Sequence, residues 1–182
     1  NFDLSTAGGS NRDGSQPTHR FANSIIGEVL NSNTSVRRLK LNPGPGREGG
    51  TILNLIHHAS KSSLKSLDLT GVGLGDRGGV MFFEALLEGK CKFLTALFIG
   101  ENQLTDHAVG GALIEIMRNP TCNITTLDIS HNSLGAPVIT QSLKHNQSLN
   151  GLVINGNPIN DDGLRLLGDV LLDKNCTCLL TS

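Results

Sequence analysis

The residues best suited to bind a phosphate lie in a glycine-rich stretch at 44–51. This stretch follows a predicted strand and precedes a predicted helix, and its GxxxxGxT spacing is that of a P-loop. Gly50, however, stands where a P-loop has the lysine that reaches the terminal phosphates, and Pro45 lacks one of the amides that would cradle them. We therefore interpret the stretch as a turn of the chain and expect no nucleotide hydrolysis.

The histidines are not spaced as metal ligands. His57 and His58 are adjacent, so on a helix they point about 100° apart and cannot form the i, i+4 pair that binds zinc. The other histidines have no partner at a ligand spacing: His19, His107, His131 and His145. No nucleophile–base pair can be assembled either. The sequence thus predicts a protein that is not an enzyme and that uses no cofactor or metal ion.

The composition argues against several kinds of partner. The 182 residues have a formal net charge of -1 and include no Trp or Tyr, so neither a basic footprint nor a stacking platform for nucleic acid is expected. No apolar run approaches the roughly 20 residues that a membrane-spanning helix requires. The first residues lack the apolar core of a signal peptide. We expect a cytoplasmic protein, with cytoskeletal and axonemal settings left open.

A repeated frame organises the chain. Residues 94–104 have the pattern LxxLxLxxNxL, and related copies start at residues 36, 64, 94, 124, 149 and 179. This pattern with a period near 29 residues resembles the leucine-rich repeat. We predict a single array over 1–182, with a Gly- and Ser-rich loop insertion at 7–18 and an incomplete repeat at 179–182. Its repeats are placed at about 1–35, 36–63, 64–93, 94–123, 124–148 and 149–178.

Each repeat is expected to form one short strand and one helix. Leu97 and Ile99 alternate with Phe98, so the two aliphatic side chains share one strand face and Phe98 points to the other. Aspartates are placed as helix N-caps: Asp76, Asp106 and either Asp161 or Asp162. Pro137 begins a shorter helix that ends near Lys144. The last helix is expected to bury Leu164, Leu167, Val170 and Leu171.

These elements predict an α/β solenoid shaped like a horseshoe. Helices are about 10 Å across and paired strands lie about 4.8 Å apart, so the helical side must fan out. A parallel β-sheet is then expected on the concave face and α-helices on the convex face. Because an Asn amide donates and accepts at once, we interpret Asn102, Asn132 and Asn157 as a structural ladder under the turns that follow the strands.

The array resembles the ribonuclease-inhibitor-like leucine-rich repeats. The match is best at 64–74 followed by Gly75-Asp76 and at 124–134 followed by Gly135, whereas Val72 stands where Asn is usual. Similar repeats occur in NOD-like receptors, Ran GTPase-activating protein, tropomodulin-type proteins and axonemal proteins. The resemblance implies a non-catalytic protein–protein interaction module within a larger intracellular scaffold, sensor, or cytoskeletal or axonemal protein. Its partners would be other proteins, together with adjoining repeats or domains.

An alternative from another class is a GTPase-activating protein of the Ran type. That activity needs an arginine at a polar edge, and the sequence offers one cluster: Arg37, Arg38 and Arg47. The cysteines point to no chemistry of their own. Cys91, Cys122 and Cys176 each lie two or three residues before a repeat start, and we interpret them as small buried thiols in a reducing compartment.

The concave strand positions form the candidate binding face. They are basic at one end, acidic in two places, and apolar in two others, and Phe98 among small residues is a candidate anchor for a partner. Gly100 and Ser130 are expected to point the same way. Under the competing interpretation, the aspartates merely solvate the sheet and neighbours cover Phe98. The candidate residues are Arg38, Lys40, Asp68, Phe98, Asp128 and Val153.

Overall fold

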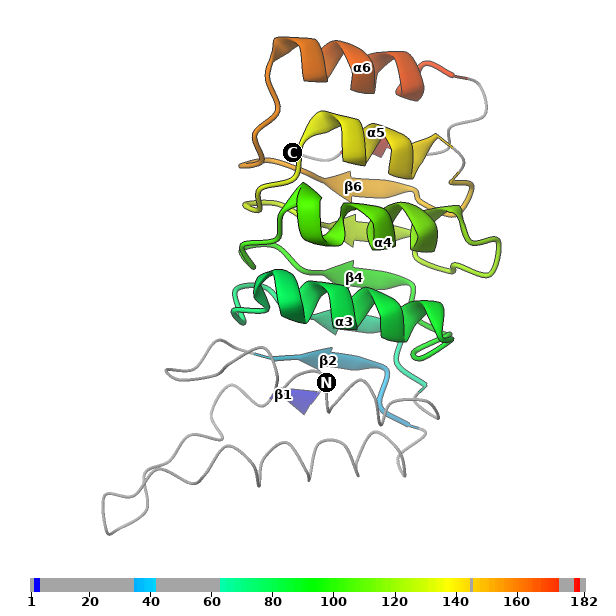
Figure 1. Cartoon of the computed structure of the whole chain (residues 1–182). Coiled ribbons are helices and arrows are strands. Elements are labelled where there is room, and N and C mark those ends of the chain that lie inside the picture. The colour runs from blue at the N-terminus through cyan, green and yellow to red at the C-terminus, as the bar shows by residue number, and fades with distance from the viewer. Residues whose placement is uncertain (1, 4–34, 42–62, 145, 174–178, 181–182) are drawn as a thin grey trace, which may run out of the picture.

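The computed structural model describes residues 2–3, 35–41, 63–144, 146–173 and 179–180. These residues form a parallel sheet whose strands are ordered as in the chain (Figure 1). The strands are β1 (Phe2–Asp3), β2 (Arg38–Lys40), β3 (Ser66–Asp68), β4 (Ala96–Phe98), β5 (Thr126–Asp128), β6 (Gly151–Val153) and β7 (Leu179–Leu180). The described helices are α3 (Gly75–Leu87), α4 (Asp106–Arg118), α5 (Ala136–Leu143) and α6 (Asp161–Leu171).

The helices form a single layer on one side of the sheet (Figure 1). Each described helix packs against the next one along the chain, α3 on α4, α4 on α5, and α5 on α6. The other face of the sheet is not covered by any of these helices, and we call it the open sheet face. The predicted α/β solenoid of alternating strands and helices is confirmed by this architecture.

The hydrophobic core lies between the sheet and the helices. The middle residue of each three-residue strand points into it, from Leu39 through Leu97 to Leu152, and each of these three is at most 4% exposed. Phe82 and Phe83 from α3 fill the space opposite, with ring centroids 5.7 Å apart in an edge-on arrangement. The predicted alternation in β4 is therefore confirmed, because Leu97 is fully buried and Phe98 is only partly buried.

The helix starts differ from the prediction. Asp76 and Asp106 lie inside the first turns of α3 and α4, whose N-cap residues are Leu74 and Thr105, so the prediction of aspartate N-caps is wrong there. In α6 the N-cap is Asn160, whose side-chain oxygen accepts a hydrogen bond from the Gly163 N–H at 2.9 Å. The shorter helix is confirmed: α5 has a proline in its first turn and ends at Leu143.

Two further expectations need correction. Leu180 pairs with Leu152, so the last copy of the frame begins two residues before Leu179, the predicted start. Leu164 was expected to be buried, yet it is 55% exposed because no described element packs against that flank of α6. The glycine-rich stretch at 44–51, the insertion at 7–18 and the pair His57 and His58 lie outside the described residues.

Candidate protein-binding face

The outward residues of the strands align in rows across the open sheet face. The register brings Asp68, Phe98 and Asp128 side by side on adjacent strands, with Lys40 before them and Val153 after them. Neighbouring strands lie about 4.8 Å apart, so the row places a carboxylate on each side of Phe98. A second row runs beside the first and contains Arg38, Ser66, Ala96, Thr126 and Gly151.

Phe98 has small neighbours on its own strand. Ala96 is the preceding residue on the open sheet face, and Gly100 follows without a side chain. A Cβ atom at Gly100 would lie 2.8 Å from Ser130 Oγ and 3.3 Å from Asp128 Oδ1, which is closer than a real Cβ tolerates at the first atom. Phe98 itself is partly buried, so its ring is neither fully covered nor fully exposed.

Asp68 is held by a cation from the adjacent strand. Its Oδ2 lies 2.7 Å from Lys40 Nζ, and its Oδ1 accepts the Thr70 N–H at 3.1 Å. Burial opposes ionisation of this carboxyl, but the hydrogen bonds from Lys40 and Thr70 and the charge of Lys40 outweigh it, so the pKa of Asp68 is lowered. Asp68 is thus an anion whose charge is already partly compensated.

Asp128 has no such cation. Its Oδ1 accepts hydrogen bonds from the Ser130 backbone N–H at 2.9 Å and the Ser130 hydroxyl at 2.6 Å. Among the described residues, no ion pair engages Asp128. Ser130 and Gly100 lie on the same side of the sheet as Asp128, as predicted, because the Ser130 hydroxyl bonds Asp128 Oδ1 and a Cβ at Gly100 would contact both residues. Both residues are nevertheless buried, Ser130 to 7% exposure, so they offer little surface themselves. The anionic charge of the row is consequently least compensated beside Phe98 and Asp128.

The asparagines hold the turns that follow the strands. Asn102 Oδ1 accepts the Leu74 N–H at 3.1 Å, and its Nδ2 donates to the carbonyls of Leu69 at 2.8 Å and Ile99 at 3.0 Å. Each such amide therefore connects the turn of its own repeat with the turn of the repeat before it. Asn132 makes the equivalent bonds one repeat later.

The last asparagine of the set repeats this pattern. Asn157 accepts the Leu134 N–H at 2.9 Å and donates to Ile129 O at 2.9 Å and Ile154 O at 3.0 Å. Val72, the substitute in the earliest described turn, is 2% exposed and packs into the hydrophobic core. The side-chain amides of these asparagines are hydrogen-bonded to backbone groups, so they are not available to a partner. The open sheet face therefore remains the candidate surface for recognition.

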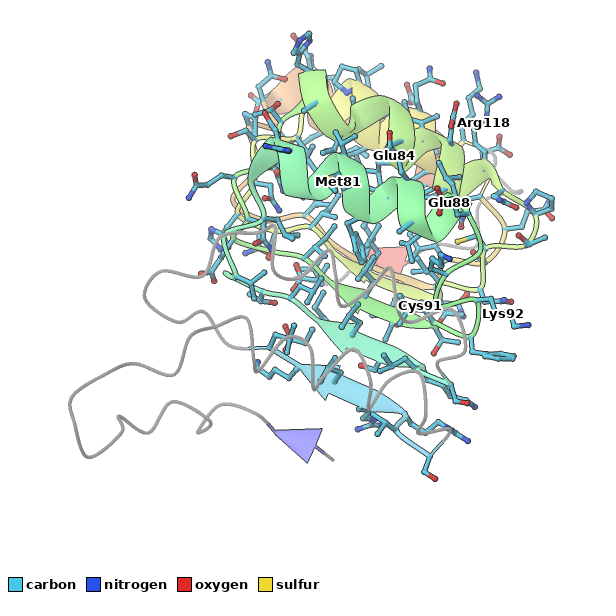
Figure 2. All side chains as sticks on the ribbon, turned by 60° about the horizontal axis from the view of Figure 1, so that its bottom comes forward. Met81, Glu84, Glu88, Cys91, Lys92 and Arg118 are labelled. Atoms are coloured by element: carbon cyan, nitrogen blue, oxygen red, sulfur yellow. The ribbon has the colours of Figure 1, made fainter. Side chains whose placement is uncertain are left out.

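Cys91, one of the two cysteines in the described part of the chain, gives little sign of reactivity. Cys91 is buried, and burial raises the pKa of its thiol to about 11, so it stays protonated at neutral pH. Cys91 and the half-buried Cys122 line a crevice of about 60 Å³ between the ends of α3 and α4. Figure 2 shows Cys91 and Lys92 just beyond α3. Within the described residues, no group of three or more potential ligands could hold a metal ion.

Four exposed apolar side chains in the described residues were not singled out from the sequence: Met81, Phe93, Leu166 and Leu172. Phe93 is 51% exposed just before β4, and Lys92 Nζ lies 5.2 Å from its ring centroid. Met81 is 42% exposed on α3, the helix that also carries Glu84 and is followed by Glu88 at its C-cap (Figure 2). The position of Phe93 is occupied by polar residues in the other described repeats, whereas the position of Met81 is occupied in α6 by Leu166, which is also exposed.

Comparison with known proteins supports the leucine-rich repeat pattern seen in the sequence. The family model described as "Leucine Rich repeat" matches residues 60–83, 122–137 and 145–168. The chain folds as a leucine-rich-repeat solenoid, and its repeats are similar to those of ribonuclease inhibitor. A solved structure of the tropomodulin C-terminal domain from Caenorhabditis elegans has the same fold, with a TM-score of 0.62, 17% identity, and coverage of 82% of this chain and 90% of that one.

Several curated proteins have sequences similar to these repeats. "NACHT, LRR and PYD domains-containing protein 3" is 38% identical over 100 residues in Bos taurus, covering 49% of this chain and 10% of that protein. The Macaca mulatta protein of that name is 30% identical over 160 residues, covering 83% of this chain and 15% of the relative. Ribonuclease inhibitor of Sus scrofa is 36% identical over 86 residues, covering 46% of this chain and 19% of the inhibitor.

The chain therefore spans only a small part of the length of these relatives, between 10% and 19%. The family match and the relatives imply a protein-binding module. In the part of the chain that the structure describes, no helix is long and apolar enough to cross a membrane.

Proposed function

We propose that this chain recognises a protein partner through its open sheet face, with Phe98 at the centre of the contact. The observation that carries this proposal is the row Asp68, Phe98, Asp128, in which a partly accessible aromatic ring lies between two carboxylates. Aromatic residues are enriched among the few positions that contribute most of the binding energy of interfaces. The sheet also offers a rigid surface, because the opposite side chains of the same strands are buried in the core.

The charge of the row favours a partner with a basic side chain next to an apolar one. Asp68 already pairs with Lys40, whereas Asp128 lacks a cation within the described residues. A lysine or arginine of the partner would therefore gain most beside Asp128, and an apolar group would cover Phe98. Val153 extends the apolar surface on the far side of Asp128.

The module belongs, in this proposal, to a larger cytoplasmic scaffold, sensor, or cytoskeletal or axonemal protein. The support is that the matched relatives are several times longer than the matched region. For the GTPase-activating alternative, Arg37 precedes β2 and Arg38 begins it; both are exposed, but exposure alone does not make an arginine catalytic. Arg47 lies outside the described residues. A GTP-hydrolysis assay with a panel of small GTPases tests that alternative, and stimulation that Arg38→Ala abolishes would favour it over simple binding.

The test of the binding face uses Phe98→Ala against Phe93→Ala. Both variants remove an aromatic ring that is at least partly accessible, but only Phe98 lies on the open sheet face. Proteins captured from a native cell extract by the wild-type chain are identified by mass spectrometry and compared between the variants. The proposal predicts specific partners that Phe98→Ala loses and Phe93→Ala retains. Partners lost with Phe93→Ala alone would move the contact to the loop before β4.

A further inference from the structure

Asparagine followed by glycine occurs twice near β6, at Asn150-Gly151 and at Asn155-Gly156. In this dipeptide the backbone nitrogen of the glycine can attack the side-chain carbonyl carbon of the asparagine, because glycine has no Cβ to hinder the approach. Both asparagines are exposed, so accessibility does not separate the two pairs. The hydrogen bonds of the attacking nitrogen do separate them.

The first pair is held in the parallel sheet. Gly151 begins β6, and its N–H donates to Thr125 O at 3.0 Å. The N–H of Asn150 donates to the same carbonyl at 2.8 Å. The Gly151 nitrogen can attack only after its bond breaks and the start of β6 separates from its neighbour. Such an opening of a paired strand is rare in a folded protein, so this pair is protected.

The second pair lies in the turn that follows β6. Within the part of the chain that the structure describes, the Gly156 N–H donates no hydrogen bond. Gly156 has a φ of 71°, a conformation that glycine adopts without strain. Attack by the Gly156 nitrogen on the Asn155 side chain therefore breaks no backbone hydrogen bond of the described residues.

A histidine from the preceding repeat contacts both residues of this second pair. His131 Nε2 lies 3.1 Å from Asn155 Nδ2, the nitrogen that has to leave. The ring also lies against Gly156, because a Cβ added there would come within 2.7 Å of His131 Cε1. The His131 N–H donates to Asn155 O at 2.8 Å and holds the turn beside the imidazole. Histidine can give or take a proton near neutral pH, so a proton donor lies at the leaving group.

We propose that Asn155 is a site of self-deamidation assisted by His131. The Gly156 nitrogen bonds to Asn155 Cγ and loses its proton to water. The Cγ–Nδ2 bond breaks, and the leaving nitrogen takes a proton from the imidazolium of His131 and departs as ammonia. His131 then recovers a proton from solvent. Water opens the succinimide ring at either carbonyl carbon, which leaves aspartate or isoaspartate at this position without any oxidation or reduction.

The modification changes both the charge and the backbone at the end of β6. Asn155 follows Val153 by two residues, and Val153 pairs with Asp128, so a new carboxylate would add to the anionic charge at this end of the row. Isoaspartate would also add a methylene group to the backbone at the residue whose carbonyl accepts the His131 N–H. An effect on partner binding rests on the proposed function, whereas the modification itself does not.

The test follows the full chain at neutral pH in water enriched in heavy oxygen, with digestion and mass spectrometry of the peptides. Label should enter at Asn155 at least about tenfold faster than at Asn150, because only the Gly151 nitrogen is held in the sheet. In chain unfolded by urea the two rates should agree within about threefold, because the hydrogen bonds of the sheet are lost.

The role of the imidazole is tested with His131→Asn, a residue that suits the positive φ of 50° at this position. It should slow labelling of Asn155 by at least about tenfold in the folded chain and have no effect in urea. His107→Asn is the matched control, because His107 is an exposed histidine on α4 and should leave the rate unchanged. Circular dichroism verifies that both variants are folded.

Three outcomes would overturn the proposal. Absence of label at Asn155, or equal labelling of Asn155 and Asn150 in the folded chain, would exclude the site. Labelling of Asn155 that a folded His131→Asn variant leaves unchanged or accelerates would exclude assistance by His131. These measurements need no partner, so their failure is distinguishable from a failure of binding through Phe98.

Discussion

Removing the side-chain amide of Asn132 should lower the free energy of unfolding more than the loss of so few atoms suggests. Asn132 Oδ1 accepts the N–H groups of Leu104 at 3.0 Å and Asn102 at 3.1 Å, and its Nδ2 donates to three carbonyls, including those of Ile99 and Ile129. Alanine leaves the two buried N–H groups without this acceptor, at about 1–3 kcal/mol each. We therefore expect Asn132→Ala to lower the free energy of unfolding by about 2–6 kcal/mol.

The control is Thr125→Ala, which removes a hydrogen bond of a different kind. Thr125 Oγ1 donates to Thr95 O at 3.1 Å, but that carbonyl also accepts the backbone N–H groups of Thr125 and Thr126 at 2.8 and 3.1 Å. Its loss should cost less than about 1 kcal/mol, because the carbonyl stays satisfied. Urea unfolding monitored by circular dichroism measures both variants. Equal shifts in the two midpoints would refute the reasoning that the amide is irreplaceable at the turn.

Three further predictions follow from neighbouring features. Leu97→Asp should unfold the chain, because it buries an unpaired carboxylate, whereas Phe98→Asp should leave far-UV circular dichroism nearly unchanged; unfolding by Phe98→Asp would show that the strand faces are misassigned. The pKa of Asp68 is lowered on folding, so its contribution to stability is complete above its usual value of 3.8 and is lost as pH falls through the folded pKa. Lys40→Met should weaken that acid dependence, and an unchanged profile would exclude the ion pair as its cause. Cys91 should resist iodoacetamide at pH 7.5 in the folded chain, and rapid alkylation there would contradict its burial.

Sequence reasoning located the strands because their signal is local. The pattern around Leu97 and Ile99 alternates within five residues, and the observed strand faces follow it. The same alternation places Phe98 on the open sheet face, and the register then aligns it with Asp68 and Asp128. Recurrence of the repeat pattern was enough to predict the α/β solenoid, because each strand must stack on the next to bury its aliphatic side chains.

The errors arise where the partner of a residue is distant in sequence. Asp76 was assigned to its own helix, but its carboxylate binds Thr105, 29 residues away in the following repeat. Ser130 lies on the open sheet face but is buried because its hydroxyl bonds Asp128 Oδ1, a contact that a face assignment by alternation does not include. Leu164 has the sequence of a buried position, yet its exposure depends on which element packs beside α6. Local patterns specify the repeat, and contacts between repeats decide the rest.

The central claim is that the open sheet face around Phe98 binds a protein partner. Its most direct test is a titration of one purified captured partner against the wild-type chain, Phe98→Ala and Phe93→Ala, with circular dichroism to verify that each variant is folded. We predict that Phe98→Ala raises the dissociation constant by roughly thirtyfold, the equivalent of about 2 kcal/mol of binding free energy. Phe93→Ala should leave the dissociation constant within about twofold of the wild-type value. An unchanged dissociation constant for a folded Phe98→Ala variant would contradict the claim and place recognition on the helices or loops.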